Sequence, residues 1–494
     1  MPVADMVSVS ISLTLRPEVV MQSLAEQPTE ATWRDILRGE YAGVSAVLAG
    51  GIALHAVNIT LSATMLPSVV TEIGGQNLYA WNATLATLAA ILSAAVTGNL
   101  LRRTGERLGF ALAGLVFGLG SLMAALALTM PMLLLGRVIQ GAGGGMLFTL
   151  CYSMIVVVYP ERLWSRAMAL LSGTWGVTML FGPAIGGIFA ELGMWRLGFG
   201  IMLPIAVMFI ALTIGILPRT NPDRSAPEPI AVRQLLLLAG AVLLISLGSV
   251  ATAAVWAVAA VAASILLGFL LIRGEQGTGT RLFPRGAVDW RSPLCLSLLV
   301  MALLIFCINA EFFMPFYLQR LHGLSPLMAG YIAALVSIGW AVSEVYSARF
   351  TGRQMCRTVL VGPLLMTAVC IALGLSTPMF AQTGPALVTF MSIALIGLGV
   401  GIGLGWPHLN TFILQFTDPS ERDMAASALS TVQMSAVAIG TAIAGLVGNF
   451  SGFNEVEDIT RIANSAIWMF GCFSVVAAMA VLASKALISG MPQD

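Results

Sequence analysis

The chain has 494 residues, of which 58% are hydrophobic and 10% are charged, and its formal net charge is +1. Soluble domains carry about 25% charged residues, so this composition excludes a soluble globular protein and predicts an all-α protein that crosses a membrane many times. The near-zero net charge gives no sign of a nucleic-acid partner, and we expect none.

Residues 1–40 form the most polar long segment of the chain. They lack the charged start, apolar run and small-residue cleavage site of a secretory signal peptide. We interpret them as a cytoplasmic N-terminal tail, with a short interfacial helix near residues 32–38.

Apolar stretches long enough to cross a membrane follow this tail. A crossing helix needs about 20 predominantly apolar residues. Fourteen stretches are candidates: residues 41–70, 79–101, 108–128, 132–159, 168–193, 198–217, 235–250, 254–272, 294–318, 327–348, 358–375, 386–415, 426–450 and 463–484. Only residues 252–256 separate the seventh span from the eighth, so one long re-entrant segment stays an alternative for that pair.

The positive charges are distributed unevenly over the predicted loops. If both termini are cytoplasmic, most loop arginines lie on the cytoplasmic side, and only Arg196, Arg320 and Arg461 lie outside. Cytoplasmic loops carry an excess of lysine and arginine. We therefore expect both termini in the cytoplasm, which requires an even number of spans.

Several short patterns occur twice in the same order. RRTGER after the second span is echoed by RFTGRQ after the tenth, ATMLPSVV by EFFMPFYL, and FGPAIGG by IGTAIAG. Transporters are often built from such repeats, with the substrate site near the midplane. We expect six-helix bundles at residues 41–217 and 294–484, cytoplasmic linkers with two extra spans at residues 218–293, and a cytoplasmic tail at residues 485–494.

Residues 133–187 combine a charge with many glycines inside two predicted spans, joined by a short loop that carries Glu161, Arg162 and Arg166. A guanidinium inside a membrane usually faces a wet interior or a partner, and glycine lets helix backbones approach closely. The pattern indicates a membrane protein that moves. Its members are Arg137 and Gln140 in the fourth span and Gly173, Gly176, Gly182, Pro183, Gly186 and Gly187 in the fifth.

These two runs resemble motifs of a known family. GRVIQGAGGG resembles the fourth-helix motif of the major facilitator superfamily, and GTWGVTMLFGPAIGG resembles its fifth-helix antiporter motif. PFYLQRLHGLSPLMAGY resembles the ninth-to-tenth connection of the fourteen-span drug:proton antiporters. The resemblance covers about residues 41–484. It implies the major-facilitator fold, with two six-helix bundles plus two linker helices, in the bacterial cytoplasmic (inner) membrane.

Two positions depart from that family's pattern. The first helix of the family usually carries an acidic residue ahead of its Leu-Pro, where this chain has Asn58. The gate loop after the second helix usually carries an acidic residue where this chain has Arg102. The missing first-helix acid moves the expected proton site to Glu311, or allows another coupling ion or none. The remaining gate-loop residues that we single out are Gly98, Arg103, Gly105 and Arg107.

An energy source within the chain is not expected. Its single lysine, Lys485, lies in the C-terminal tail, so there is no Gly-Lys-Ser/Thr loop to hold phosphate. The six cysteines lack CxxC or metal-ligand spacing. We therefore expect no enzymatic activity, cofactor or metal, and any uphill transport must use an ion gradient or a partner.

Ionisable groups inside spans are functional candidates by default. Glu311 is the preferred proton carrier, because burial favours the neutral form of a carboxyl group and a cavity-facing glutamate can then exchange a proton near neutral pH. A structural hydrogen-bonding role is the alternative. Arg137 is expected to sense the protonation of a carboxylate across the helix interface, with a fixed hydrogen bond to backbone carbonyls as its alternative.

Three further residues complete the candidates. Glu344 lies near the cytoplasmic end of the tenth span, where a structural or gating ion pair with Arg349 or another loop arginine is favoured over proton coupling. His55 and His408 could titrate near neutral pH, although lone histidines more often pack between helices or line a substrate site.

The sequence thus predicts a secondary active exporter of small amphipathic or drug-like molecules. We expect proton antiport through rocking of the two halves, by a monomer whose partners are the small-molecule substrate, protons and the lipid bilayer. An uptake symporter or facilitator of a small metabolite is the first alternative. A non-transporting membrane sensor is the second.

Overall fold

The computed structural model describes residues 33–219, 230–251, 253–277, 280–379, 381, 384–455 and 457–490. Across these ranges the regular elements are all helices. Thirteen of the described helices are long and apolar enough to cross a membrane. The predicted all-α polytopic fold is therefore confirmed.

The N-terminal half begins with a short helix where one was expected, and it contains an unusually long helix, α4. The 45 residues of α4 would extend about 68 Å at 1.5 Å per residue, which is more than twice the about 30 Å of a bilayer's hydrocarbon core. Gly105 divides α4 with φ 74° and ψ 171°, so α4 supplies two spans and the described residues contain fourteen spans in total. The elements are α2 (Trp33–Leu37), η1 (Gly39–Tyr41), α3 (Ala42–Ile73), η2 (Gln76–Leu78), α4 (Trp81–Ala125), α5 (Met130–Val158), α6 (Glu161–Glu191), α7 (Trp195–Gly200) and α8 (Met202–Ile216).

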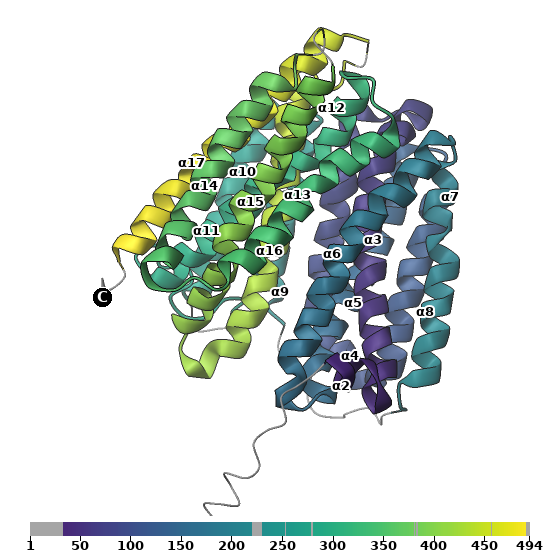
Figure 1. The fold of residues 1–494 in the computed structure, drawn as a ribbon, viewed down its shortest axis with the longest axis vertical. Helices are drawn as coiled ribbons and strands as arrows, with labels where there is room; N and C mark the ends of the chain where they lie inside the picture. Colours follow the sequence, from purple (N-terminus) through teal and green to yellow (C-terminus); the bar gives the residue numbers. More distant parts are fainter. Residues whose placement is uncertain are drawn as a thin grey trace, which may run out of the picture.

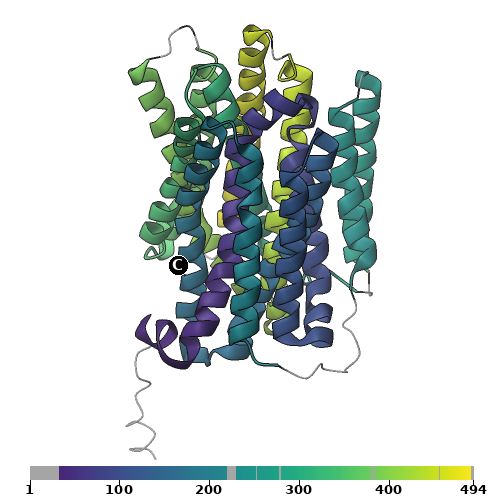
Figure 2. The same cartoon turned by 90° about the vertical axis from the view of Figure 1, so that its right-hand side faces the viewer.

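The two doubtful spans are separate helices. α9 (Val232–Ser249) and α10 (Ala254–Glu275) each meet the length and hydropathy of a crossing helix, and they form a hairpin at the edge of the molecule, coloured teal in Figure 2. Residues 220–229 of the preceding linker lie outside the described part. The C-terminal half follows with α11 (Pro293–Ile308), η3 (Asn309–Phe313), α12 (Met314–Arg320), α13 (Pro326–Ser347), α14 (Gly352–Ser376), α15 (Pro385–Gln415), η5 (Pro419–Glu421), α16 (Arg422–Ser451) and α17 (Ile459–Ser489).

Several helices extend beyond their predicted spans, and two of them show the reason. α6 begins at Glu161, so Arg162 and Arg166 belong to its first turns and not to a loop, and α14 begins at Gly352 instead of residue 358. Hydropathy marks charged residues as loops, but glutamate and arginine are good helix formers. A helix can therefore continue past the apolar stretch that hydropathy detects.

All spans run between two ends of the molecule (Figure 1). We call the end with α2 and residues 102–107, 162–166 and 349–357 the basic end, because its arginines gather there. We call the opposite end, with residues 74–80, 192–194, 321–325, 452–455 and 457–458, the far end. The helices of the two halves lie side by side near the far end and diverge toward the basic end in Figure 1.

Equivalent contacts in the two halves agree with the predicted repeat. Gly105 of RRTGER and Gly352 of RFTGRQ both have positive φ, at 74° and 53°. A Cβ on Gly187 would clash with Leu327 at the start of α13, and a Cβ on Gly445 would clash with Ala80 just before α4. Each half thus presents a glycine from its fifth helix to the second helix of the other half. The exact limits of the two bundles stay a prediction.

The segment between α10 and α11 is fixed at the basic end. Glu275 accepts hydrogen bonds from the backbone N–H groups of Leu282 and Phe283. Glu421, in the α15–α16 connection, accepts from Arg281 Nη2 at 2.8 Å and from the backbone N–H of Arg285 at 2.7 Å. This connection ties the hairpin to the C-terminal half.

The Glu421 contacts predict a pH-dependent connection. The pKa of Glu421 is lowered from 4.5, mainly by the Arg285 backbone N–H, with Arg281 adding to it and partial burial acting in the opposite direction. A depressed folded-state pKa gives stability that is complete above the unfolded value and is lost as pH falls through the folded value. At pH 7 we expect Glu421→Ala to lower the hydrogen-exchange protection of the Arg285 amide about fivefold, equivalent to roughly 1 kcal/mol for this partly exposed group.

The wild-type protein should lose the same protection only below about pH 4.5. Asp289→Asn is the matched control, because Asp289 bonds the backbone of Arg291 in the same segment. Equal protection of the Arg285 amide in wild type and Glu421→Ala would contradict this assignment.

Candidate functional site

A chain of polar side chains crosses the interior of the N-terminal half. Arg137 on α5 is 2% exposed, and its Nη1 donates to Asn58 Oδ1 on α3 at 2.8 Å and to Gln140 Oε1 at 2.5 Å. Gln140 Nε2 donates in turn to Ser121 Oγ on α4 at 2.8 Å. The network therefore links three helices of one half through a single guanidinium.

The charge of Arg137 is met by neutral oxygens. Within the described residues no carboxylate forms an ion pair with it, and its Nε has no hydrogen-bond partner. A buried charge is stable only when it is paired and hydrogen-bonded. Asn58 thus occupies the position where an acidic residue would form an ion pair with Arg137. No carboxylate is therefore available for proton exchange next to Arg137.

The ninth span is broken at the predicted proton carrier. α11 ends at Ile308, and the residues Asn309–Phe313 form the 3₁₀ segment η3 before α12 begins at Met314. Proline removes the hydrogen bond to the carbonyl four residues earlier and clashes with it, and four residues before Pro315 is Glu311. Such breaks inside spans are tolerated where neighbouring groups satisfy the backbone, and they often mark hinges.

Glu311 is half-buried, and its Oε2 has no hydrogen-bond partner in the described residues. Asn309 beside it is fully buried and donates to the Ile305 carbonyl, and a Cβ on Gly440 of α16 would reach the Asn309 side chain. The structure therefore holds the carboxyl group in a fixed, packed segment but leaves one of its oxygens unsatisfied. An acceptor with a purely structural role would have both oxygens hydrogen-bonded. An oxygen without a partner leaves the carboxyl group able to bind and release a proton.

The same 3₁₀ segment contacts the other half. Tyr79, which precedes α4, is 4% exposed and lies against Phe313 of η3, Phe316 of α12 and Phe453, with ring centroids 5.3, 5.7 and 5.2 Å apart. Its hydroxyl has no hydrogen-bond partner among the described residues. Sequence reasoning missed Tyr79, because a tyrosine at a span boundary resembles the aromatic residues that favour membrane interfaces.

Other contacts also join the halves at the far end. Thr84 and Thr441 are hydrogen-bonded at 2.9 Å, and Arg320 Nη2 donates to Thr71 Oγ1 at 2.9 Å. The backbone N–H of Leu327 donates to Glu191 Oε1 at 3.3 Å. Together with the Tyr79 cluster these contacts close the far end.

The glycines of α6 divide into two sets. A Cβ on Gly182 or Gly186 would clash with α3 in the same half, and a Cβ on Gly187 would clash with Leu327 of the other half, whereas a Cβ on Gly173 or Gly176 would meet nothing within 4 Å. In this conformation the glycines near the far end are therefore close to another helix, whereas Gly173 and Gly176 are not. Gly173 lies fourteen residues before Gly187, close to four helical turns, so both occupy nearly the same face.

The remaining candidates lie apart from Glu311. His55 packs between Phe148 of α5 and Trp175 of α6, at centroid distances of 5.7 and 5.8 Å, as expected of a helix-packing or substrate-lining group. The predicted Glu344–Arg349 ion pair is absent from the described residues. Arg349 lies instead over the Tyr346 ring at 4.0 Å. Tyr346, in the last turn of α13, offers an aromatic face to Arg349, while Glu344 lies against Trp340.

His408 of α15 is 5% exposed, and its Nε2 has no partner in the described part of the chain. Of the gate-loop residues, Gly98, Arg102 and Arg103 lie within α4, and only Gly105 departs from helical geometry. The predicted loop is therefore a single-residue break, because glycine alone supplies the positive φ that a sharp reversal needs.

The amino-acid sequence is similar to those of known membrane transporters over most of its length. The model of the Major Facilitator Superfamily matches residues 48–441 and 294–489. A Mycobacterium tuberculosis protein named a probable multidrug-efflux transporter is 35% identical over 460 residues, covering 92% of this chain and 96% of that protein. A Staphylococcus aureus protein named the multidrug efflux pump SdrM is 24% identical, covering 79% of this chain and 86% of that protein.

Solved structures share the architecture at low identity. A peptide transporter matches with a TM-score of 0.67 at 13% identity, covering 92% of this chain and 97% of that chain. A D-xylose–proton symporter matches with a TM-score of 0.62 at 17% identity, covering 92% and 99%. These likenesses concern the fold alone.

Proposed function

Because the chain belongs to the Major Facilitator Superfamily, we propose that it exports small amphipathic, drug-like molecules in exchange for protons. The names of the similar Mycobacterium and Staphylococcus proteins support drug export. One observation carries the mechanism: Glu311, whose buried Oε2 has no hydrogen-bond partner among the described residues, lies in the broken helix that also contacts the opposite half.

The arrangement of the halves supports alternating access. Excess arginine marks the cytoplasmic side, so the basic end is cytoplasmic and the far end faces outside. The far end is closed by the Tyr79 cluster and by Gly187 against Leu327. Near the basic end the same α6 face is open at Gly173 and Gly176. We infer that this conformation faces the cytoplasm and can load substrate there.

Proton exchange at Glu311 provides the coupling. The neutral carboxyl group costs far less to bury than the carboxylate, which is expensive without a partner. When Glu311 loses its proton, its carboxylate would therefore favour a conformation of η3 in which water or a new partner reaches it. Because Phe313 of the same segment packs on Tyr79, that change would loosen the far-end contact. A proton taken up from outside would restore it.

Transport by purified protein in liposomes tests this function. A panel of amphipathic dyes loaded on the side of the basic end, with an imposed pH gradient, should show export that stops when the gradient is collapsed. Accumulation in the opposite direction would identify an uptake symporter. Absence of transport for every dye, with no ligand-dependent thermal shift, would favour a sensor.

Gly173 offers a selective test of closure at the cytoplasmic end. A Cβ on Gly173 meets no atom within 4 Å in this conformation, so we expect Gly173→Leu to fold normally. When the open α6 face closes on the other half, the side chain should obstruct the contact, at a cost of about 1–3 kcal/mol for overpacking. Transport should fall about tenfold while dye binding persists, as measured by flux and fluorescence titration of the same preparation.

Gly215→Leu is the matched control, because a Cβ on Gly215 of α8 likewise meets nothing within 4 Å. Wild-type flux in Gly173→Leu would show that this face never closes.

A further inference from the structure

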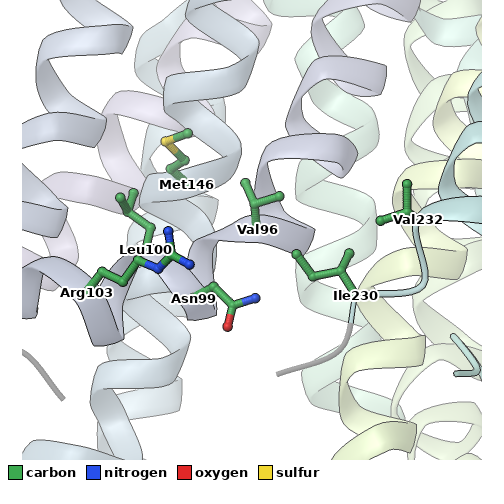
Figure 3. Close-up of a pocket in the computed structure, with 7 residues that line it drawn as sticks. All are labelled: Val96, Asn99, Leu100, Arg103, Met146, Ile230 and Val232. Atoms are coloured by element: carbon green, nitrogen blue, oxygen red, sulfur yellow. The ribbon is translucent and has the colours of Figure 1, made fainter. Parts of the chain in front are cut away.

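A cavity of about 520 Å³ lies at the basic end between the N-terminal half and the α9–α10 hairpin. Its size falls within the about 300–1,000 Å³ usual for ligand sites. Figure 3 shows the α4 side chains and Met146 of α5 on one side, with α9 and the residues that lead into it on the other. The lining residues are Val96, Asn99, Leu100, Arg103, Met146, Ile230 and Val232.

The lining is chemically divided. Leu100, Met146 and Ile230 supply a hydrocarbon surface, while Asn99 and Arg103 supply an amide and a guanidinium on the same helix. Arg103 is exposed and forms no hydrogen bond or ion pair with another described residue. A cation that is free to bind next to an apolar wall fits a guest with one anionic group and a hydrocarbon chain.

We propose that this cavity binds an anionic phospholipid of the cytoplasmic leaflet. Its phosphate group lies at Arg103, and an acyl chain follows Leu100, Met146 and Ile230. Basic pockets between membrane helices on the cytoplasmic side bind anionic headgroups. The lipid can enter from the bilayer, because the apolar side chains of Val96 and Val232 are 41% and 55% exposed. Inorganic phosphate alone would leave the apolar wall uncovered.

The cavity also joins parts that move separately in the proposed transport cycle, and this consequence rests on the proposed function. Its α4 wall belongs to the N-terminal half, whereas the hairpin is tied to the C-terminal half through Glu421. A lipid that binds both walls in this conformation stabilises it relative to any state in which they separate.

Native mass spectrometry of the full-length protein tests the lipid site. The probes are a palmitoyl-oleoyl phosphatidylglycerol and the matched phosphatidylcholine, added to delipidated protein in detergent. We expect retention of phosphatidylglycerol over phosphatidylcholine, and at least about fivefold weaker retention in Arg103→Ala, as one arginine contributes about 1 kcal/mol to anionic lipid binding. Arg353→Ala, which removes an exposed arginine from the same end of the other half, should retain the lipid.

Two further measurements distinguish a lipid in the cavity from an anion bound to the arginine alone. Val96→Trp keeps the charge but fills the mouth of the cavity, and it should weaken retention as well. Excess inorganic phosphate should not displace the lipid. Equal retention of both lipids, loss of retention in Arg353→Ala to the same extent as in Arg103→Ala, or full displacement by phosphate would each overturn the proposal. Size-exclusion profiles confirm that each variant is folded, and Arg103→Gln replaces Arg103→Ala if the latter aggregates.

Discussion

Replacing Glu311 with glutamine should reduce efflux driven by an imposed pH gradient to the level of protein-free liposomes. Glutamine keeps the size and polarity of the side chain, so η3 and its contact with Tyr79 should persist. The glutamine side chain cannot take up or release a proton at the pH values of the assay. Gradient-driven flux of a fluorescent substrate in proteoliposomes measures the effect.

Two comparisons make the Glu311 result specific. Exchange of labelled for unlabelled substrate without a gradient needs no net proton movement, so Glu311→Gln should retain it. Glu457→Gln alters an exposed carboxyl group at the far end and should leave both activities unchanged. Normal gradient-driven efflux in Glu311→Gln would remove Glu311 from the coupling mechanism.

Replacing Gly187 with leucine should abolish transport by holding the far end open. A Cβ at Gly187 already clashes with the Leu327 backbone of the other half, and a backbone cannot move aside as a flexible side chain can. Overpacking costs about 1–3 kcal/mol, which would shift the balance between closed and open far ends about ten- to hundredfold. An Ala80→Cys reporter, buried at that end in the wild type, should then react faster with an impermeant maleimide.

The repeat supplies an internal check on this prediction. Gly445→Leu should have the same effect through Ala80, scored by flux, because Gly445 is the counterpart of Gly187. Gly215→Leu, at a position with open space, should preserve transport and slow labelling of Ala80→Cys. Slow labelling in Gly187→Leu together with normal flux would show that closure of the far end does not depend on this contact.

The fold followed from the sequence because membrane spans are governed by a simple physical requirement. Each crossing helix must be long and apolar, so hydropathy found the fourteen spans, the two extra helices among them. Hydropathy did not predict the charged ends of helices, such as the start of α6 at Glu161, because it measures only the apolar stretch and not the full length of the helix.

The site could be predicted only in part. Glu311 and Arg137 were visible as charges in apolar runs, and Asn58 and Gln140 were singled out near them, but the hydrogen bonds that join these residues were not predicted. Arg137 bonds Asn58 on α3, and Gln140 bonds Ser121 on α4, and only the packing of the three helices brings these side chains together. Tyr79 contacts residues more than 230 positions away in the sequence, and no local pattern reports such a contact.

The division of the α6 glycines also required the structure. Gly173 and Gly187 look alike in sequence and occupy nearly the same helix face. Their surroundings differ because the two halves meet at one end and separate at the other. A conformational state is a property of the whole molecule, so the sequence indicated motion without indicating which end is closed.

The relative movement of the two halves can be measured with paired spin labels. One pair replaces Arg162 and Arg353 at the basic end, and the other replaces Leu192 and Met328 at the far end, all of them exposed positions. When substrate and a pH gradient are applied, the basic-end distance should shorten while the far-end distance lengthens. Distances that stay fixed, or that change in the same direction at both ends, would contradict alternating access by rocking of the two halves.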